Sequence, residues 1–498
     1  MKKNIPQLLI GLALLAATPA FAQAPTVVTP TAAPSGAWED WSRQIKNPTD
    51  WLTWGADLRL RNEYFNNALT LTDAGGASVR HEQDYFRIRT RLWASATPVT
   101  NLSVNARVAA EPREWMKPSY ARQFGFGEGL EWRYGVFDCL NLKWADVLDL
   151  PLTICVGRQD VMLGETGNWW LVADGTPFDG SWTMFFDAVR ATYQAKEIKT
   201  KFDVAFLHQT ADPGGFVPTL GSSYDHTING ATQPYYLSEQ NEQGAVVYVS
   251  NQSLENMQID GYFIYKNDHE VNKISYGDNA DIYTLGSRFS GTPGAHWAYS
   301  VEGAYQFGRK QDPTVLASYT TTPNIRRDIS AYGGNAYLTY LFKDKLNNQI
   351  SLVGEYLSGD DPNSKGTDEM FDILWGRWPR WSEMAVFYYV NENKGKVCQM
   401  NNLGRIGPSW TVSPFRNMTV KTTYNALFAP EAVPTRAANA SLFSDGGQFR
   451  GHFVQSYLKY QFNKNVSGHL WGELLWEGNY YAQRDLLTFL RAEMMFTF

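Results

Sequence analysis

Long apolar runs are missing from this sequence of 498 residues. After residue 22 no stretch of about 18 apolar residues occurs, which excludes a transmembrane helix. Charged residues are also scarce, at 19%, whereas soluble proteins carry about 25%. Hydrophobic residues reach 44%, yet the mean hydropathy is −0.36. These values exclude a helical membrane protein and are unusual for a soluble domain.

Cysteines and local catalytic motifs are scarce too. The three cysteines (Cys139, Cys155 and Cys398) are an odd number and predict no disulfide framework. Cys139 and Cys155 either form a bridge or lie as small apolar residues on neighbouring strands. The seven histidines lack metal-ligand spacing, and neither a Gly-x-Ser-x-Gly elbow nor a phosphate loop occurs. We therefore predict no catalytic residue, metal or cofactor, with an enzyme of dispersed catalytic residues as the alternative.

Aromatic residues are abundant instead. They make up 14% of the chain, with 18 Trp, 27 Tyr and 27 Phe. Many aromatics with few charges suit a β-barrel that has an apolar belt outside and polar groups inside. They also suit a large secreted carbohydrate-binding β protein, so composition leaves these two classes open.

The N-terminus predicts export. Lys2 and Lys3 precede a short apolar run, residues 8–17, and Ala20-Phe21-Ala22 forms a cleavage site. We predict a signal peptide over 1–22. A Pro/Thr/Ala-rich linker and short periplasmic leader follow over 23–50, with a short helix or a plug segment in 37–50, and then a barrel over 51–498. Cleavage removes two lysines and leaves 42 basic and 50 acidic residues, which argues against nucleic acid as a partner.

Strands are predicted from alternation, because successive side chains in a strand point to opposite faces. In the first strand the apolar residues are Leu52, Trp54, Ala56, Leu58 and Leu60, and the polar ones include Asp57, Arg59, Arg61 and Glu63. In the last strand Leu490, Ala492, Met494, Phe496 and Phe498 alternate with Arg491 and Glu493. Several runs reach the roughly 9–11 residues that a membrane-spanning strand needs.

The fold that these patterns predict is all-β. We expect a closed antiparallel transmembrane β-barrel of 18 strands with long outer loops, because bacterial barrels have even strand numbers. The best loop candidates are residues 66–82, 112–130, 211–243, 310–327, 359–382 and 429–450. Residues 360–366 lack the full acidic pattern of a calcium loop and predict a tight turn.

Arginines gather on the polar faces of the first three predicted strands. They are Arg59, Arg61, Arg87, Arg89, Arg91 and Arg107. If these faces line a lumen, the arginines would select anions and bind carboxylates. Arg491 and Glu493 would join them, because the last strand must pair with the first for the barrel to close. Lys459 would also face the lumen, because it alternates with Leu458 and Tyr460 in a predicted strand near the C-terminus. The alternative is a solvated face with the arginines paired to Asp57, Glu63 and Glu111.

Five internal segments and the last strand resemble the alginate export family of outer-membrane barrels. The internal segments are Val156-Gly157-Arg158-Gln159-Asp160, Phe186-Asp187-Ala188-Val189-Arg190, residues 302–308, residues 358–361 and residues 405–410. The resemblance covers about residues 51–498. It implies an 18-stranded barrel with an arginine-rich constriction for an anionic polyuronate. By motif match it also implies that Arg158 and Arg190 line the pore.

Four functions follow as hypotheses. The first is an outer-membrane channel of a Gram-negative bacterium that passes an anionic, alginate-like polysaccharide or oligosaccharide by passive diffusion. The second is a general or anion-selective porin for small solutes, the third a soluble β-rich adhesin, and the fourth an outer-membrane enzyme. For the first, the expected partners are outer-membrane lipid, the saccharide and periplasmic secretion components.

Overall fold

The computed structural model describes most of the chain after the predicted linker. The described residues are 37–75, 79, 81–117, 130–132, 135–161, 163, 183–221, 226–228, 231–233, 237, 240–269, 279–311, 326–375, 381–393, 400–434 and 439–498. The predicted signal peptide, the first part of the linker and Cys398 lie outside them. In the leader, α1 spans Ala37–Lys46, where the sequence predicts a short helix. No helix among the described residues is long and apolar enough to cross a membrane.

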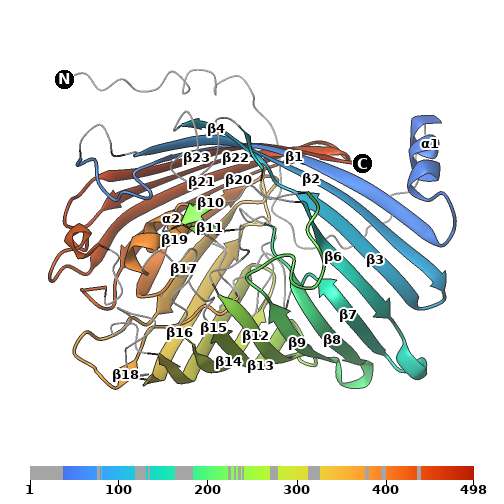
Figure 1. The fold of residues 1–498 in the computed structure, drawn as a ribbon, viewed down its shortest axis with the longest axis horizontal. Helices are drawn as coiled ribbons and strands as arrows, with labels where there is room; N and C mark the ends of the chain where they lie inside the picture. The colour runs from blue at the N-terminus through green and yellow to red at the C-terminus, as the bar shows by residue number, and fades with distance from the viewer. Residues whose placement is uncertain are drawn as a thin grey trace.

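Eighteen strands in the described part of the chain form one closed antiparallel barrel, which confirms the predicted fold (Figure 1). Each barrel strand pairs with its neighbours along the chain. In addition, β1 (Leu52–Asn66) pairs with β23 (Leu486–Thr497) over ten residue pairs. This pairing closes the sheet, so that no edge with unsatisfied backbone groups faces lipid.

The remaining barrel strands follow in chain order. They are β2 (Glu82–Val99), β3 (Leu102–Ala110), β6 (Gly135–Trp144), β7 (Leu152–Gln159), β8 (Phe186–Ala195), β9 (Thr200–Gln209), β12 (Asn241–Asn251), β13 (Met257–His269), β14 (Asp281–Gly291), β15 (Trp297–Gln311), β16 (Arg326–Leu341), β17 (Gln349–Leu357), β19 (Leu403–Val412), β20 (Met418–Phe428), β21 (Phe449–Asn463) and β22 (Val466–Glu477).

Short elements lie in the connections. They are β4 (Arg113–Lys117), β5 (Leu130–Glu131), β10 (His226–Ile228), β11 (Ala231–Gln233), β18 (Thr367–Asp368), α2 (Ala385–Glu392) and three 3₁₀ turns, η4 (Val147–Asp149), η5 (Lys196–Ile198) and η6 (Ala440–Leu442). Of these, β4 extends the sheet beside β2, and β18 pairs with β16.

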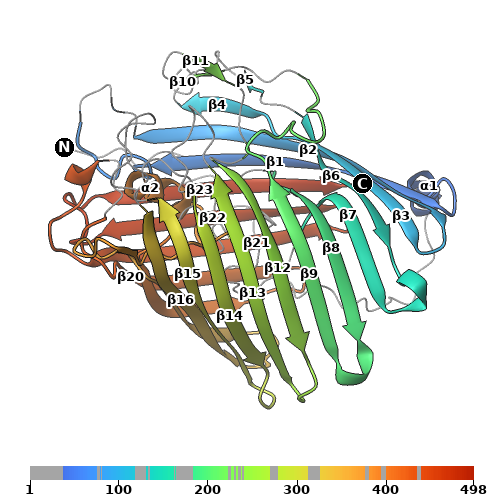
Figure 2. The same ribbon diagram turned by 60° about the horizontal axis from the view of Figure 1, so that its bottom comes forward.

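The two ends of the barrel differ in their connections (Figure 2). At one end, named the short-turn end, strands are joined by brief turns such as residues 100–101 and 464–465. Both the start of β1 and the end of β23 lie there. So does α1, because Trp54 Nε1 donates to Ile45 O (2.6 Å) and Lys46 Nζ lies 4.8 Å from the Phe498 ring centroid.

The opposite end, named the long-loop end, carries the long connections. The six predicted loops all fall there, and five agree with the connections to within a few residues. The sixth was predicted too short, because the connection after β17 runs from 358 to 402 and not only to 382. Its residues 360–366 include the predicted tight turn, in which Asp361 accepts a hydrogen bond from the Asn363 backbone N–H (2.8 Å).

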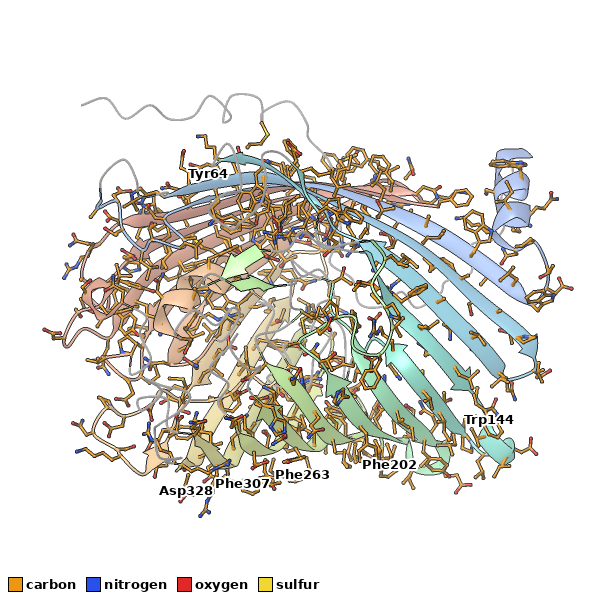
Figure 3. All side chains as sticks on the ribbon, viewed as in Figure 1. Tyr64, Trp144, Phe202, Phe263, Phe307 and Asp328 are labelled. Carbon is orange, nitrogen blue, oxygen red and sulfur yellow. The ribbon has the colours of Figure 1, made fainter. Side chains whose placement is uncertain are left out.

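The outer face of the barrel is apolar and aromatic. In the strands Leu58, Leu60 and Phe496 are exposed, while their sequence neighbours Arg59 and Arg61 are fully buried inside. Figure 3 shows Phe202, Phe263 and Phe307 pointing away from the barrel interior. The predicted alternation of the first and last strands is therefore confirmed, and the apolar face forms a belt suited to lipid.

The connection between β17 and β19 folds into the lumen and is named the inner segment (described over 358–375, 381–393 and 400–402). Its helix α2 lies inside the ring of strands in Figures 1 and 2. Large side chains of the inner segment, such as Phe371, Trp381 and Tyr388, pack with inward residues of the barrel, such as Phe65 and Phe453. The core of the protein therefore lies within the barrel.

Cys139 and Cys155 lie on neighbouring strands, β6 and β7, and both are free. Of the two alternatives left by the sequence, the structure therefore shows the unbridged one.

Candidate functional site

Seven arginines line the lumen on four adjacent strands, and together they are named the basic wall. They are Arg59, Arg61, Arg87, Arg89, Arg91, Arg107 and Arg491. They face inward because each alternates with apolar residues of the outer belt. The same lumen faces of β23, β1, β2 and β3 carry three carboxylates, Asp57, Glu63 and Glu493. Arginine therefore exceeds carboxylate on this part of the wall.

The strand registers align these residues into levels across the sheet. One level runs through His469, Glu493, Arg61 and Arg87, which are opposite one another in turn on β22, β23, β1 and β2. Lys459 extends the same level on β21, opposite His469. Directly opposite residues have Cβ atoms about 4.5–5.5 Å apart, so each level is a continuous polar band.

Carboxylates contact every arginine of the basic wall. Arg61 Nη2 lies 2.5 Å from Glu493 Oε2, and Arg91 Nε lies 2.8 Å from Asp57 Oδ2. Arg491 pairs with Glu63. The other arginines pair as follows: Arg59 with Glu111 (2.9 Å), Arg87 with Glu63 (3.3 Å), Arg89 with Asp57 (3.7 Å) and Arg107 with Asp138 (2.7 Å) and Asp160 (3.1 Å). The pairing that the sequence offered as the alternative is therefore present within the lumen.

Accessibility differs along the basic wall. The side chains of Arg59, Arg61 and Arg87 are almost completely buried, whereas Arg91 and Arg107 expose 23% and 21% of theirs. A guanidinium has five N–H donors, so the one carboxylate partner of Arg91 and the two of Arg107 leave donors for a further anion. Arg91 and Arg107 are thus the members of the wall best placed to contact a solute.

Glu111 joins the basic wall to a neighbouring connection. It follows β3, accepts a hydrogen bond from Arg59 Nη2 (2.9 Å) and accepts another from the Thr183 backbone N–H (2.8 Å). Burial acts to raise the pKa of Glu111, but the charges of Arg59, Arg87 and Arg89 outweigh it and lower the pKa below its usual value. The carboxylate therefore stays ionised and holds Arg59 in place.

Arg190 and Lys459 also face the lumen. Arg190 donates to Asp203 on the inner face of β9 (2.7 Å), and its neighbour Val189 is exposed on the outer face. Lys459 lies between the inward residues Tyr457 and Gln461 of β21. Together with the basic wall and Glu493, ten of the eleven residues that the sequence predicts to line the pore therefore lie at inward-facing strand positions.

Arg158 is the exception. It lies two residues after Val156, which is exposed on the outer face, with Gly157 (φ +115°) between them, and it lies directly opposite Asp187. Its side chain is 1% exposed. The guanidinium makes two bonds to Asp187 (2.9 and 3.0 Å), donates to Phe137 O and Pro213 O, and stacks on Phe185. The structure thus places Arg158 in a covered ion pair with Asp187, beside the Phe185 ring.

The inner segment is fixed to the barrel wall at the start of α2. Glu473 of β22 is fully buried and accepts hydrogen bonds from Ser382 Oγ (2.8 Å), the backbone N–H groups of Glu383 and Met384 (3.0 Å each) and Gln455 Nε2 (2.9 Å). A carboxylate satisfies the backbone N–H groups at a helix start and interacts favourably with the helix dipole. Glu473 therefore orients α2 across the lumen.

The end of α2 is fixed by Arg450 of β21. Its guanidinium binds both carboxylate oxygens of Glu392 (2.5 and 2.7 Å) and lies over the Tyr389 and Tyr480 rings. The next residue, Gly451, has a φ of +143°, and a Cβ there would lie 2.1 Å from Trp476 O. Only glycine fits this β-bulge, which turns Arg450 inward.

Further contacts tie the inner segment to other parts of the wall. Asp360 binds Arg327 of β16 through both oxygens (2.9 and 3.0 Å), and the backbone of Asp372 exchanges two hydrogen bonds with the Gln306 side chain. On the basic wall, Arg491 Nη2 lies 3.0 Å from Glu383 Oε2. Charged and polar groups from several strands therefore hold the inner segment within the barrel.

Sequence analysis did not predict these attachment residues. Alternation alone would place Glu473 on an inner face, but nothing local to Glu473 indicates that its partners lie about ninety residues earlier in the chain. Among the described residues, no group of three or more His, Cys, Asp or Glu side chains could hold a metal ion. The site's chemistry is thus that of ion pairs and hydrogen bonds along a lumen.

Comparisons with known proteins agree with this geometry. A family model described as alginate export matches residues 50–488. No curated protein matches the chain. Three solved structures share the fold at low identity. OccAB1 of Acinetobacter baumannii has a TM-score of 0.52 at 10% identity, with coverage of 89% of this chain and 96% of that chain.

The other two structures cover the same share of this chain. OccK8 (OprE) of Pseudomonas aeruginosa has a TM-score of 0.51 at 10% identity, with coverage of 89% of this chain and 98% of that chain. A BenF-like porin from Pseudomonas fluorescens Pf-5 has a TM-score of 0.50 at 9% identity, also with coverage of 89% and 98%. At these identities the likeness shows the fold alone.

Proposed function

The chain belongs to the alginate export family, and from this premise we propose that its pore passes an anionic, alginate-like polysaccharide or oligosaccharide by passive diffusion. The family and the fold make the protein an outer-membrane channel of a Gram-negative bacterium. In such barrels short turns face the periplasm and long loops face outward. The short-turn end is therefore periplasmic, where secretion components would meet the channel. A channel needs no catalytic group, and we assign it none.

The observation that carries the proposal is the excess of seven arginines over three carboxylates on the lumen face of β23, β1, β2 and β3. Rings and clusters of arginine in a pore favour anions, and a guanidinium matches the geometry of a carboxylate. The four further carboxylates that pair with the wall (Glu111, Asp138, Asp160 and Glu383) come from outside these faces and hold the arginines in position.

Planar-bilayer recordings test this proposal. In a salt gradient the reversal potential should show a preference for chloride over potassium. A uronate oligosaccharide should then reduce the current at a lower concentration than a neutral dextrin of the same length. Equal block by the two saccharides would contradict an anionic substrate.

The inner segment favours a second candidate, an anion-selective porin for small solutes. Its many attachments hold a buried helix within the lumen, which narrows the path. The two candidates differ in the size of solute that crosses. Liposome swelling with mono-, di- and oligouronates separates them, because a small-solute porin admits only the shortest.

A further inference from the structure

Three cations at the short-turn end of the lumen lie on strands that do not belong to the basic wall, and together they are named the mouth cluster. They are Lys143 (β6), Arg190 (β8) and Lys201 (β9). Each has a sequence neighbour that is exposed on the outer face, namely Trp144, Val189 and Phe202 (Trp144 and Phe202 are labelled in Figure 3). Because successive residues of a strand point to opposite faces, the three cations face the lumen.

The mouth cluster is accessible to solvent, unlike most of the basic wall. Lys201 exposes 33% of its side chain and Arg190 exposes 18%, and Lys143 is exposed as well. Lys143 and Lys201 are each next to the last residue at the periplasmic end of their strands, whereas Arg107 lies farther along β3. A solute that enters from the periplasm therefore meets these two lysines before it reaches the basic wall.

One buried carboxylate holds two members of the mouth cluster in place. Arg190 Nη2 lies 2.7 Å from Asp203 Oδ1, and Lys201 Nζ lies 2.8 Å from Asp203 Oδ2. Asp203 also accepts a hydrogen bond from Thr192 Oγ1 (2.5 Å). Two cations on one carboxylate leave a positive charge in excess. A guanidinium has five N–H donors and an ammonium has three, so both cations keep donors for a further carboxylate.

Lys143 forms a second positive centre beside this pair. Lys143 and Arg190 lie directly opposite Cys155 of β7, one on each side of it. Neighbouring strands are about 4.8 Å apart, so the backbones of Lys143 and Arg190 are about 10 Å apart. Within the described part of the chain, Lys143 makes no hydrogen bond or ion pair. Its ammonium group is therefore available to an anion from solution.

Acidic side chains in the adjoining turns leave the mouth cluster unpaired. The turn between β6 and β7 carries Asp146 and Asp149, and the turn between β8 and β9 carries Glu197. None of these three carboxylates forms an ion pair with another described residue. Asp203 is therefore the only described carboxylate that contacts the cluster, and it contacts two cations at once.

We propose that the mouth cluster is a binding site for the carboxylates of an acidic saccharide at the periplasmic end of the pore, in which Lys143 binds one carboxylate and Arg190 with Lys201 binds another. This inference rests on the proposed function and adds to it where the saccharide first binds. Hydrogen bonds between charged partners are stronger than neutral ones, and accessible cations in a concave mouth raise the local concentration of anionic solutes.

Calorimetric titration of the full chain in detergent tests this site, with trigalacturonate, galacturonate and maltotriose as probes. Trigalacturonate should bind more tightly than galacturonate, because only the trimer engages both positive centres at once. Maltotriose, which has no carboxylate, should bind most weakly. The double variant Lys143→Gln/Lys201→Gln should raise the Kd for trigalacturonate about five- to tenfold, since it removes one cation from each centre.

A matched control removes the same charge elsewhere at the periplasmic end. Lys343→Gln/Lys345→Gln replaces two exposed lysines in the turn between β16 and β17, and it should keep the native Kd for trigalacturonate. Equal weakening by the two double variants would overturn the proposal, because the effect would then come from the overall charge of the protein.

The outcomes also separate this inference from the proposed function. The reversal potential of the native channel in a potassium chloride gradient reports on the basic wall, and its failure to favour chloride would contradict the proposed function. A native Kd for trigalacturonate in Lys143→Gln/Lys201→Gln would overturn the mouth cluster alone. If the double variant does not fold, Lys143→Gln decides, because Lys143 has no ion pair among the described residues to lose, and an unchanged Kd there would overturn the proposal equally.

Discussion

Arg61 and Glu493 meet across the seam at which the last strand closes the barrel. They are directly opposite on β1 and β23, and Arg61 Nη2 lies 2.5 Å from Glu493 Oε2. Both side chains are almost fully buried. This ion pair therefore joins the two strands that close the sheet, and one of its members, Arg61, is also part of the basic wall.

Removal of one partner of this pair should weaken the closed barrel. Glu493→Gln leaves the buried Arg61 without its nearest carboxylate, and a buried charge that loses its partner costs about 3–5 kcal/mol. The double variant Arg61→Gln/Glu493→Gln should recover part of that loss. The free energy of unfolding of the single and the double variant can be measured by urea unfolding in detergent, followed by the heat-modifiable shift on a gel. Equal stability of the single variant and the native protein would contradict a role in closure.

Exposure within the lumen should decide which arginines affect selectivity. Arg91→Ser removes a partly exposed charge from the basic wall and should reduce the preference for chloride, as measured by the reversal potential in a potassium chloride gradient. Arg158→Ser is the comparison, because the Arg158 side chain is almost fully covered and paired with Asp187. It should lower stability by about 1–3 kcal/mol without the loss of selectivity. A loss of the preference for chloride in Arg158→Ser but not in Arg91→Ser would show that the exposure of these two arginines to the lumen is misassigned.

The faces of the strands could be predicted from the sequence because alternation is a local property. Closure could be predicted as well, since the last strand had to pair with the first, and this placed Arg491 and Glu493 beside Arg59 and Arg61. For Arg158 the sequence offers only a motif match, which does not reveal its covered ion pair with Asp187. The same kind of match implied a pore role for Arg190, and the structure pairs Arg190 with the inward residue Asp203.

The inner segment could not be predicted because its position depends on contacts between distant parts of the chain. Its polar residues resemble those of any outer loop. Glu473, Arg450 and Arg327 determine where it lies, and each contacts it from a different strand. A single sequence does not show which residues of the inner segment contact which residues of these strands.

Loosening of the start of α2 should widen the pore. Glu473→Gln lacks the charge that interacts with the helix dipole and keeps only one oxygen acceptor for the four hydrogen bonds. We expect a higher single-channel conductance and more frequent switching between levels. Glu477→Gln is the matched control, because Glu477 lies on the same strand but accepts from the Asp485 backbone N–H and not from α2. Native conductance in Glu473→Gln would contradict a fixed constriction.

The contribution of Glu111 to the stability of the protein should depend on pH. Its pKa in the folded protein is lowered, since the charges of Arg59, Arg87 and Arg89 outweigh the effect of burial. A lowered folded pKa gives stability that is fully present above the unfolded value of about 4.3 and is lost as the pH falls through the folded value. Glu111→Gln should therefore lower the urea midpoint at pH 7, and the difference from the native protein should shrink below about pH 4. A difference that stays the same from pH 7 to pH 3 would show that the Glu111 charge does not hold Arg59.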